Sequence, residues 1–153
     1  AVGRVSKLGS VEVTDQFALQ YTSHLIHIVS NVEGDLDPRF DAITALIAGH
    51  PAGTVSGAPK VRAMEIIDEL ELEKRGAYAG LVGYFSAAGD MDTCIVLRTA
   101  VVKDGKMYVQ AGGGVVADST PENEYAESVN KAKALFRAAE EAVRYASEAG
   151  RGQ

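Results

Sequence analysis

The first third of the chain contains three stretches whose pattern of hydrophobic and polar residues predicts regular structure. Residues 10–17 (SVEVTDQF) alternate briefly between apolar and polar side chains, as in a short strand. Residues 23–34 (SHLIHIVSNVEG) form an apolar, β-branched run closed by Gly34, which predicts a buried strand. Residues 39–50 repeat apolar side chains at helical spacing after Pro38, so we expect a helix there.

A second predicted helix follows the small-residue loop HPAGTVSGAPK, residues 50–60. Pro59 suits the first turn of a helix, where its missing N–H group costs nothing. Lys74, Arg75 and Gly76 together form a stop signal. Between Pro59 and this stop signal, apolar side chains recur on one face of the predicted helix, at Val61, Met64, Ile67 and Leu70.

The second half of the chain predicts a meander of strands. Three strands are expected, over Tyr78–Ser86, Met91–Lys103 and Met107–Ala117. Turn residues at 87–90 separate the first two strands, and Asp104-Gly105 between the last two is a strong hairpin signal.

The last predicted element is a long helix that starts at Pro121 and is capped by Ser119 or Thr120. Its apolar positions alternate steps of four and three residues, which keeps one face dry. These positions are Tyr125, Val129, Ala132, Phe136, Ala139, Val143 and Ala146. The fold class predicted from these elements is α/β (α+β), with largely antiparallel strands.

Composition narrows the class of protein. The net charge is −6 and the 15 Lys and Arg are scattered among 21 acidic residues, which argues against a nucleic-acid-binding surface. Cys94 is the single cysteine, so we expect no disulfide framework and a reducing, cytoplasmic compartment. No apolar run approaches the length of a membrane span, and residues 1–10 are unlike a signal peptide. The length of 153 residues suits one domain, although the chain opens without a methionine, as if within a longer polypeptide.

The loop of residues 53–60 resembles a phosphate-binding P-loop only in composition. Three residues rather than four separate Gly53 from Gly57, and Ala58-Pro59 stand before Lys60. Its N–H groups and hydroxyls lie at a predicted helix start, which suits an anion. On composition alone, an ordinary capped helix start is the favoured interpretation.

Glu124, Glu127 and Lys131 are spaced so that they share one face of the long predicted helix. Two adjacent carboxylates repel each other unless a cation joins them, and oxygen ligands favour Mg²⁺. The alternative is an ordinary solvated face on which Glu127 pairs with Lys131, and taken alone this alternative is favoured.

Three further features remain ambiguous from the residues alone. The glycines of QAGGGVVAD, residues 110–118, indicate either a bulge or a closely approaching ligand. Arg98, among apolar residues, either forms a structural salt bridge, the simpler interpretation, or binds a carboxylate. His24 and His27 point to opposite faces of a strand, so they cannot chelate one metal. Either one histidine is exposed and the other is buried and hydrogen-bonded, or a single positioned imidazole acts as an acid or base.

Taken together, these stretches resemble the chorismate-utilising enzyme family and, within it, the component I subunits of anthranilate synthases. The resemblance covers nearly the whole chain in the right order. The stretches that carry it are GRVSKLGSVEV, SHLIHIVSNVEGDL, PAGTVSGAPKVRAMEIIDELE, VGYFSAAGDMDTCIVLRTAVVKDG and VQAGGGVVADSTPENEYAESVNKAKAL.

The resemblance implies a role for each candidate residue. A histidine matching His27 transfers a proton at the chorismate ring, and a threonine matching Thr54 lies against the substrate. Tyr84 and Arg98 match residues that hold the enolpyruvyl carboxylate. The resemblance also places at the substrate Lys131 and the glycine loop, which consists of Gly112, Gly113 and Gly114. It implies that Glu124 and Glu127 face Mg²⁺.

The resemblance also implies a reaction and partners. Such enzymes are lyases of tryptophan biosynthesis that convert chorismate and ammonia to anthranilate and pyruvate, with a glutamine amidotransferase subunit supplying the ammonia. Their fold implies an antiparallel-sheet sandwich with flanking helices. The nearest alternative is aminodeoxychorismate synthase component I of the folate pathway, and isochorismate and salicylate synthases are further away.

The chain also departs from the family pattern. The family domain extends upstream with a second pair of metal-facing glutamates, so residues 1–153 correspond to its C-terminal portion, without the upstream half. Gly113 replaces the usual alanine, and residues 20–22 also differ. We therefore expect this chain alone to have little or no activity, and an inert fragment is the alternative to part of an enzyme.

Overall fold

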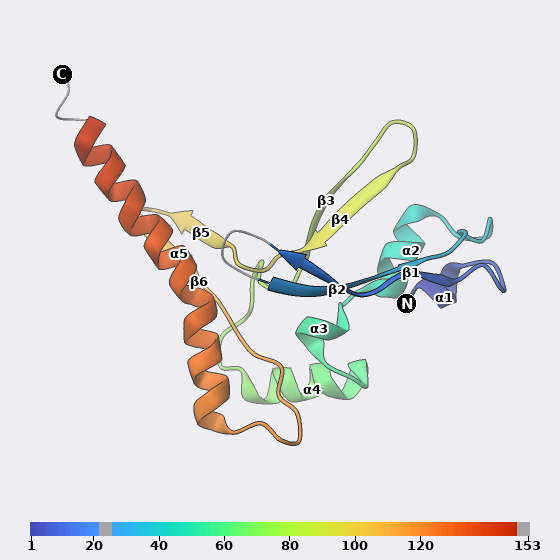
Figure 1. Cartoon of the computed structure of the whole chain (residues 1–153), viewed down its shortest axis with the longest axis horizontal. Helices are drawn as coiled ribbons and strands as arrows, with labels where there is room; N and C mark the ends of the chain where they lie inside the picture. The colour runs from blue at the N-terminus through green and yellow to red at the C-terminus, as the bar shows by residue number, and fades with distance from the viewer. Residues whose placement is uncertain (22–25, 150–153) are drawn as a thin grey trace. The chain divides into compact units, whose positions relative to one another are not determined.

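The computed structural model describes residues 1–21 and 26–149 (Figure 1). The chain forms two compact units. The first unit contains residues 1–51 and 85–91, and the second contains residues 52–84 and 92–153.

The first unit is organised around an antiparallel hairpin of β1 (Glu12–Tyr21) and β2 (Ile26–Glu33). The register pairs Tyr21 with Ile26 at one end and Glu12 with Glu33 at the other. The register shifts between Asp15 and Ala18, where Phe17 has a φ of 53° and its N–H donates to the Ser30 hydroxyl at 3.1 Å. β1 is therefore longer than the predicted strand over 10–17 and carries an irregularity at its centre.

Two helices complete this unit, α1 (Val2–Val5) and α2 (Ala42–Gly49). The Asp41 side chain caps α2 by accepting a hydrogen bond from the Thr44 N–H group at 2.7 Å. This cap places the start of the helix inside the predicted range of 39–50. The segment after α1 is tied to the segment after β2 by backbone hydrogen bonds, one of them from the Asp37 N–H group to the Val5 carbonyl at 2.8 Å.

The second unit contains the remaining elements, except that Phe85 and Met91, at the ends of two paired strands, belong to the first unit. These elements are α3 (Gly53–Ser56), α4 (Lys60–Leu70), β3 (Leu81–Phe85), β4 (Met91–Ile95), β5 (Ala100–Lys103), β6 (Lys106–Val109) and α5 (Pro121–Ala149). Strand β3 pairs with β4, and β5 pairs with β6 in an antiparallel hairpin. The long helix α5 is drawn in orange and red in Figure 1. Helices with small antiparallel sheets confirm the predicted mixed class of fold.

Several predicted boundaries are wrong. The single strand expected over Met91–Lys103 is interrupted after Ile95, because Arg98 has a φ of 51°, which extended backbone does not allow. The strand expected over Met107–Ala117 ends at Val109, before the glycine-rich segment. The strand expected over 23–34 is β2, and its first predicted residues, His24 among them, lie outside the described residues.

The region around Pro59 also differs from the prediction. Gly53–Ser56, expected as a loop, forms the short helix α3, and Pro59 is the cap of α4 rather than its first residue. Helix α4 ends at Leu70, before the predicted stop signal at residues 74–76, since Glu71 is already extended.

Burial is the largest disagreement with the sequence patterns. Among the residues that the structure describes, Val5 is the one buried apolar side chain. The strand predicted as buried is exposed, with Ile28 at 70% of its full accessibility. The face of the last helix that was expected to be buried also carries exposed side chains, with Tyr125 at 74%. The patterns identify faces that suit burial, but residues 1–21 and 26–149 supply no layer that covers them.

Candidate active site

Glu124, in the first turn of α5, has one satisfied and one unsatisfied carboxylate oxygen. Its Oε1 accepts a hydrogen bond from the Ser119 hydroxyl at 2.6 Å, and that hydroxyl in turn accepts from the Val116 N–H group at 3.0 Å. Its Oε2 is buried and finds no hydrogen-bond donor among the described residues. A buried carboxylate oxygen without a donor is costly, and a bound cation would remove that cost.

Gly113 leaves the space that this oxygen faces. A Cβ atom at position 113 would lie 2.7 Å from Glu124 Oε2. The absence of a side chain at Gly113 therefore allows the present orientation of the carboxylate. An alanine there would require the carboxylate to move.

Lys131 joins the glycine-rich segment to the same helix. Its Nζ atom donates to the Gly112 carbonyl at 3.2 Å and lies 2.5 Å from Glu127 Oε1, one turn earlier in α5. The surface pair expected from the sequence is present, but it also anchors the glycine loop. Within the described chain, no residue accepts a hydrogen bond from the N–H groups of Gly112, Gly113 and Gly114. These groups are free to receive an anion.

Thr54 lies in α3, a single helical turn, and its side chain is exposed. The turn is closed by backbone hydrogen bonds from Val55 and Ser56 to the Ala52 carbonyl and from Gly57 to the Gly53 carbonyl. Gly57 has a φ of 109°, and a Cβ atom there would lie 3.0 Å from Ala63 Cβ. The glycine is therefore required by the tight connection between α3 and α4.

Arg98 and Tyr84 both present exposed polar groups in the second unit. Tyr84 lies in β3, and Arg98 lies in the bend between β4 and β5. The salt bridge considered for Arg98 is wrong, because no described residue forms an ion pair with it. Arg98 itself lies outside both strands and is exposed, so its charge remains available to a carboxylate ligand.

His27 lies in the first unit, opposite Gln20 on the β1–β2 hairpin, and its side chain is exposed. The other nine candidate residues lie in the second unit. Lys131 forms a hydrogen bond with the glycine loop and an ion pair with Glu127. Thr54, Tyr84 and Arg98 make no such contact with these groups.

Three residues of this region were missed as site residues. Ser119 was predicted only as a helix cap, and its bond to Glu124 Oε1 was not foreseen. Tyr78 places its hydroxyl 3.3 Å from where a Cβ of Gly112 would lie, and Arg75 lies over the Tyr78 ring, 5.7 Å from its centroid. The spacing of Glu71 and Arg75 signals a pair one turn apart, although that signal does not reveal the further contacts.

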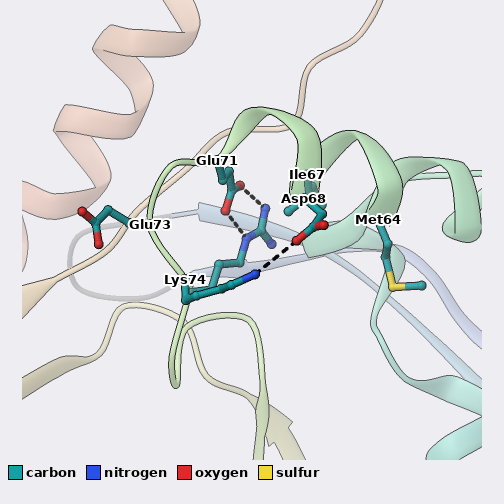
Figure 2. A pocket seen from close by; sticks show the side chains of 7 residues that line it. Met64, Ile67, Asp68, Glu71, Glu73 and Lys74 are labelled. Atoms are coloured by element: carbon teal, nitrogen blue, oxygen red, sulfur yellow. Dashed lines mark hydrogen bonds and ion pairs between the residues drawn. The ribbon is translucent and has the colours of Figure 1, made fainter.

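A shallow charged hollow lies at the end of α4 (Figure 2). Its walls carry two ion pairs, Lys74 with Asp68 at 3.2 Å and Arg75 with Glu71 at 2.5 Å. The hydrogen bonds from Arg75 lower the pKa of Glu71 below its usual range, and those bonds raise the pKa of Arg75. Four of the charged side chains of the hollow are thus already paired with one another.

The chain's residues fit part of a metal site. The unsatisfied Oε2 of Glu124 is a suitable oxygen ligand for Mg²⁺, and Glu127 follows it on the same helix. Across residues 1–21 and 26–149, no group of three or more His, Cys, Asp or Glu side chains could hold a metal ion. Nor does any helix of this part combine the length and apolar character needed to cross a membrane.

Comparison with known proteins finds relatives that share one name. The chain is 64% identical over 151 residues to anthranilate synthase component 1 of Cereibacter sphaeroides. The matched stretch covers 99% of this chain and 30% of the relative. The chain is 58% identical over 137 residues to the protein of the same name in Pseudomonas putida, covering 90% of this chain and 28% of the relative. The chain therefore spans less than a third of the length of these curated relatives.

Solved structures agree with the sequence relatives. The crystal structure of anthranilate synthase component I from Streptococcus pneumoniae matches with a TM-score of 0.82 and 53% identity, over 86% of this chain and 30% of that one. A structure from Bacillus anthracis, named as a 2,3-dihydroxybenzoate-specific isochorismate synthase, matches with a TM-score of 0.79 and 28% identity. That match covers 90% of this chain and 36% of the other.

The family of chorismate-binding enzymes matches residues 1–137. This range contains the hairpin with His27, the α3 turn, the Arg98 bend, the glycine loop and the start of α5. The resemblance predicted from the sequence is confirmed by this match and by the named relatives, and the chain belongs to the family of chorismate-binding enzymes.

Proposed function

We propose that this chain carries part of the active site that converts chorismate and ammonia to anthranilate and pyruvate. The observation that carries the proposal is the 64% identity to an anthranilate synthase component 1 across 99% of the chain. The identity to the isochorismate synthase relative is 28%, which supports the anthranilate reaction over that alternative. In this lyase reaction ammonia replaces the ring hydroxyl, and pyruvate leaves as the ring loses a proton.

The enolpyruvyl carboxylate of chorismate would bind Arg98 and Tyr84. Arg98 suits this role because its guanidinium has no ion-pair partner within the described chain and can meet a carboxylate with two parallel hydrogen bonds. The N–H groups of Gly112 and Gly114, with Gly113 between them, would complete the anion site.

Glu124 and Glu127 would hold Mg²⁺. The unpartnered Oε2 of Glu124 supports this assignment, since a carboxylate oxygen in that position is stabilised by a cation. When bound, Mg²⁺ polarises the carboxylate attached to the ring and neutralises its charge. Lys131, held between Glu127 and the Gly112 carbonyl, would fix the glycine loop against α5.

Thr54 and His27 would act on the ring. Thr54 is exposed on the α3 turn and would offer a hydroxyl to the substrate. The His27 imidazole would move the ring proton, a task that suits a side chain whose usual pKa is near neutral.

The complete site would need more than this chain. The relatives are over three times as long as the part that the chain matches, and the described residues supply too few ligands for a metal. We propose that an upstream half of the same domain completes the site and that this chain alone is inactive. In the cell, a glutamine amidotransferase subunit would supply ammonia for tryptophan biosynthesis in the cytoplasm.

The proposal is tested by product identification with a reconstituted domain, defined as this chain mixed with the part of the Cereibacter sphaeroides relative that it does not match. Chorismate, Mg²⁺ and ammonium are added, and products are identified by mass and fluorescence. We expect anthranilate and pyruvate only when both polypeptides are present. Aminodeoxychorismate as the product would support the folate-pathway alternative, and isochorismate would support the other relative. No product would favour an inert fragment.

A further inference from the structure

The Arg75 guanidinium contacts three different residues, Glu71, Val55 and Tyr78. Its Nε and Nη2 atoms bond to the two carboxylate oxygens of Glu71, at 2.8 and 2.5 Å. Its Nη1 atom donates to the Val55 carbonyl at 2.7 Å, across 20 residues of sequence. The guanidinium also lies over the Tyr78 ring, and the Arg75 side chain is only 23% exposed. Figure 2 shows Glu71 and its dashed bonds to this guanidinium.

The Val55 carbonyl belongs to α3, the turn that carries Thr54. A helix of four residues is too short to be stable by itself, because nucleation of a helix is costly. Its last carbonyl groups have no partner within the helix and need an external donor. Arg75, five residues beyond the end of α4, supplies that donor, so α3 is held by a residue from outside the helix.

The other side of the guanidinium faces the glycine loop through Tyr78. The Tyr78 hydroxyl lies 3.3 Å from the position of a Cβ at Gly112, and Lys131 bonds to the Gly112 carbonyl. Arg75 therefore lies between the Thr54 turn and the segment before α5. An arginine suits this place because its planar fork can bond to Glu71 and Val55 at once.

We propose that Arg75 is a positioning residue that holds the Thr54 turn in the conformation used for substrate binding. The assignment of Thr54 to the substrate rests on the proposed function, whereas the clamp on α3 is independent of it. Arg75 itself touches no substrate and acts through the Val55 carbonyl.

Arg62, in α4, provides a matched control. It makes two ion pairs, with Glu65 at 3.0 Å and Glu69 at 2.8 Å, where Arg75 makes one ion pair through two bonds, but the Arg62 side chain is 56% exposed and its partners are both in α4. Loss of Arg62 removes as many charged contacts without touching α3. A general effect of lost ion pairs would therefore appear in both variants.

The clamp is tested by amide hydrogen exchange of the chain, alone and in the reconstituted domain. In Arg75→Met, the amides of Val55, Ser56 and Gly57 should exchange about tenfold faster, as expected for loss of a charge-assisted hydrogen bond. Arg62→Met should leave them unchanged, and the amides of the β5–β6 hairpin should be unchanged in both variants. Equal exchange of the three amides in Arg75→Met and Arg62→Met would overturn the proposal.

The conservative variants add a second readout. Arg75→Lys should not restore slow exchange, because an ammonium lacks the fork that reaches Glu71 and Val55 together. Glu71→Gln should give an intermediate rate, since Arg75 keeps its bond to Val55 but loses the ion pair. Full rescue by lysine would contradict the clamp.

Kinetics of the reconstituted domain test the consequence for the substrate. Arg75→Met should raise the KM for chorismate about tenfold, and in a Thr54→Ala background the same change should have almost no effect. Additive effects of the two substitutions would overturn positioning through Thr54. Absence of any turnover in the wild-type sample would instead refute the proposed function, and the exchange experiment would still decide whether the clamp exists.

Discussion

At the scale of single residues, Glu124 is the most informative side chain of the candidate site. The Ser119 hydroxyl occupies one carboxylate oxygen, so that the other is directed toward Gly113 without a protein donor. The sequence predicted that Glu124 shares a face with Glu127, but not which oxygen would be free. That detail depends on a hydroxyl five residues away and on a glycine in another segment.

Glu124→Gln should weaken Mg²⁺ binding by the reconstituted domain at least about tenfold, because the neutral amide removes the charge that faces the metal. The affinity is measured by titration calorimetry with the metal alone. Glu122→Gln is the control, since Glu122 is an exposed acid in the same first turn of α5. Equal losses in the two variants would show that only the overall charge of the turn matters.

Gly57 gives a second prediction at this scale. Gly57→Ala should lower the free energy of unfolding of the reconstituted domain by about 1–3 kcal/mol, because its φ of 109° strains a residue with a Cβ. Gly53→Ala should cost nothing, since a Cβ there meets no atom within 4 Å and alanine favours the helix. Urea denaturation measures both variants, and a neutral Gly57→Ala would refute the steric account.

At the scale of elements, the sequence was a good guide where the local pattern determines the backbone. Asp104-Gly105 predicted the β5–β6 hairpin, and both residues have positive φ, at 52° and 72°. The start of α5 at Pro121 was also predicted correctly. The break at Arg98 was missed because the sequence around it alternates as a continuous strand would, and no local residue signals the bend.

The α3–α4 connection was missed for a different reason. A four-residue helix has almost no periodicity to detect, and its carbonyl is satisfied by Arg75 from beyond α4. The sequence could show the small residues of the segment but not the distant donor. The contacts of Lys131 with the Gly112 carbonyl and of Tyr78 near the same glycine are likewise tertiary.

The Glu71–Arg75 pair should make this connection sensitive to acid. Hydrogen bonds from Arg75 lower the pKa of Glu71, so the stabilisation is present above the pKa of the unfolded chain and is lost as the pH falls through the lowered folded value. An NMR titration of the Glu71 carboxyl group should therefore give a pKa below its usual range. In Arg75→Met the pKa should return toward that range, and an unchanged value would contradict the account.

At the scale of the whole molecule, the chain presents apolar faces that its described residues do not cover. Both faces of the β1–β2 hairpin are exposed, as are the large apolar side chains along α5, namely Tyr125, Val129, Phe136 and Val143. Such extensive apolar exposure marks an interaction surface. Since the chain spans 30% of its Cereibacter sphaeroides relative, we propose that the rest of the domain covers these faces.

The isolated chain should therefore bind a hydrophobic dye such as ANS strongly, and addition of the unmatched part of the relative should remove most of that signal. Size-exclusion chromatography with light scattering follows the same mixture, where we expect a complex of the two polypeptides. Unchanged dye binding together with separate elution would show that the relative does not cover these faces.

The central claim is that residues of this chain bind and convert chorismate, and the rate of anthranilate formation tests it most directly. The rate is compared between reconstituted domains that contain the wild-type chain, Arg98→Met or Arg137→Met. Arg137, on α5, is exposed like Arg98, and the described residues form no ion pair with it. Loss of a bidentate carboxylate contact predicts a fall of about a hundredfold in kcat/KM for Arg98→Met, and no change for Arg137→Met. Equal rates in all three samples would contradict the claim.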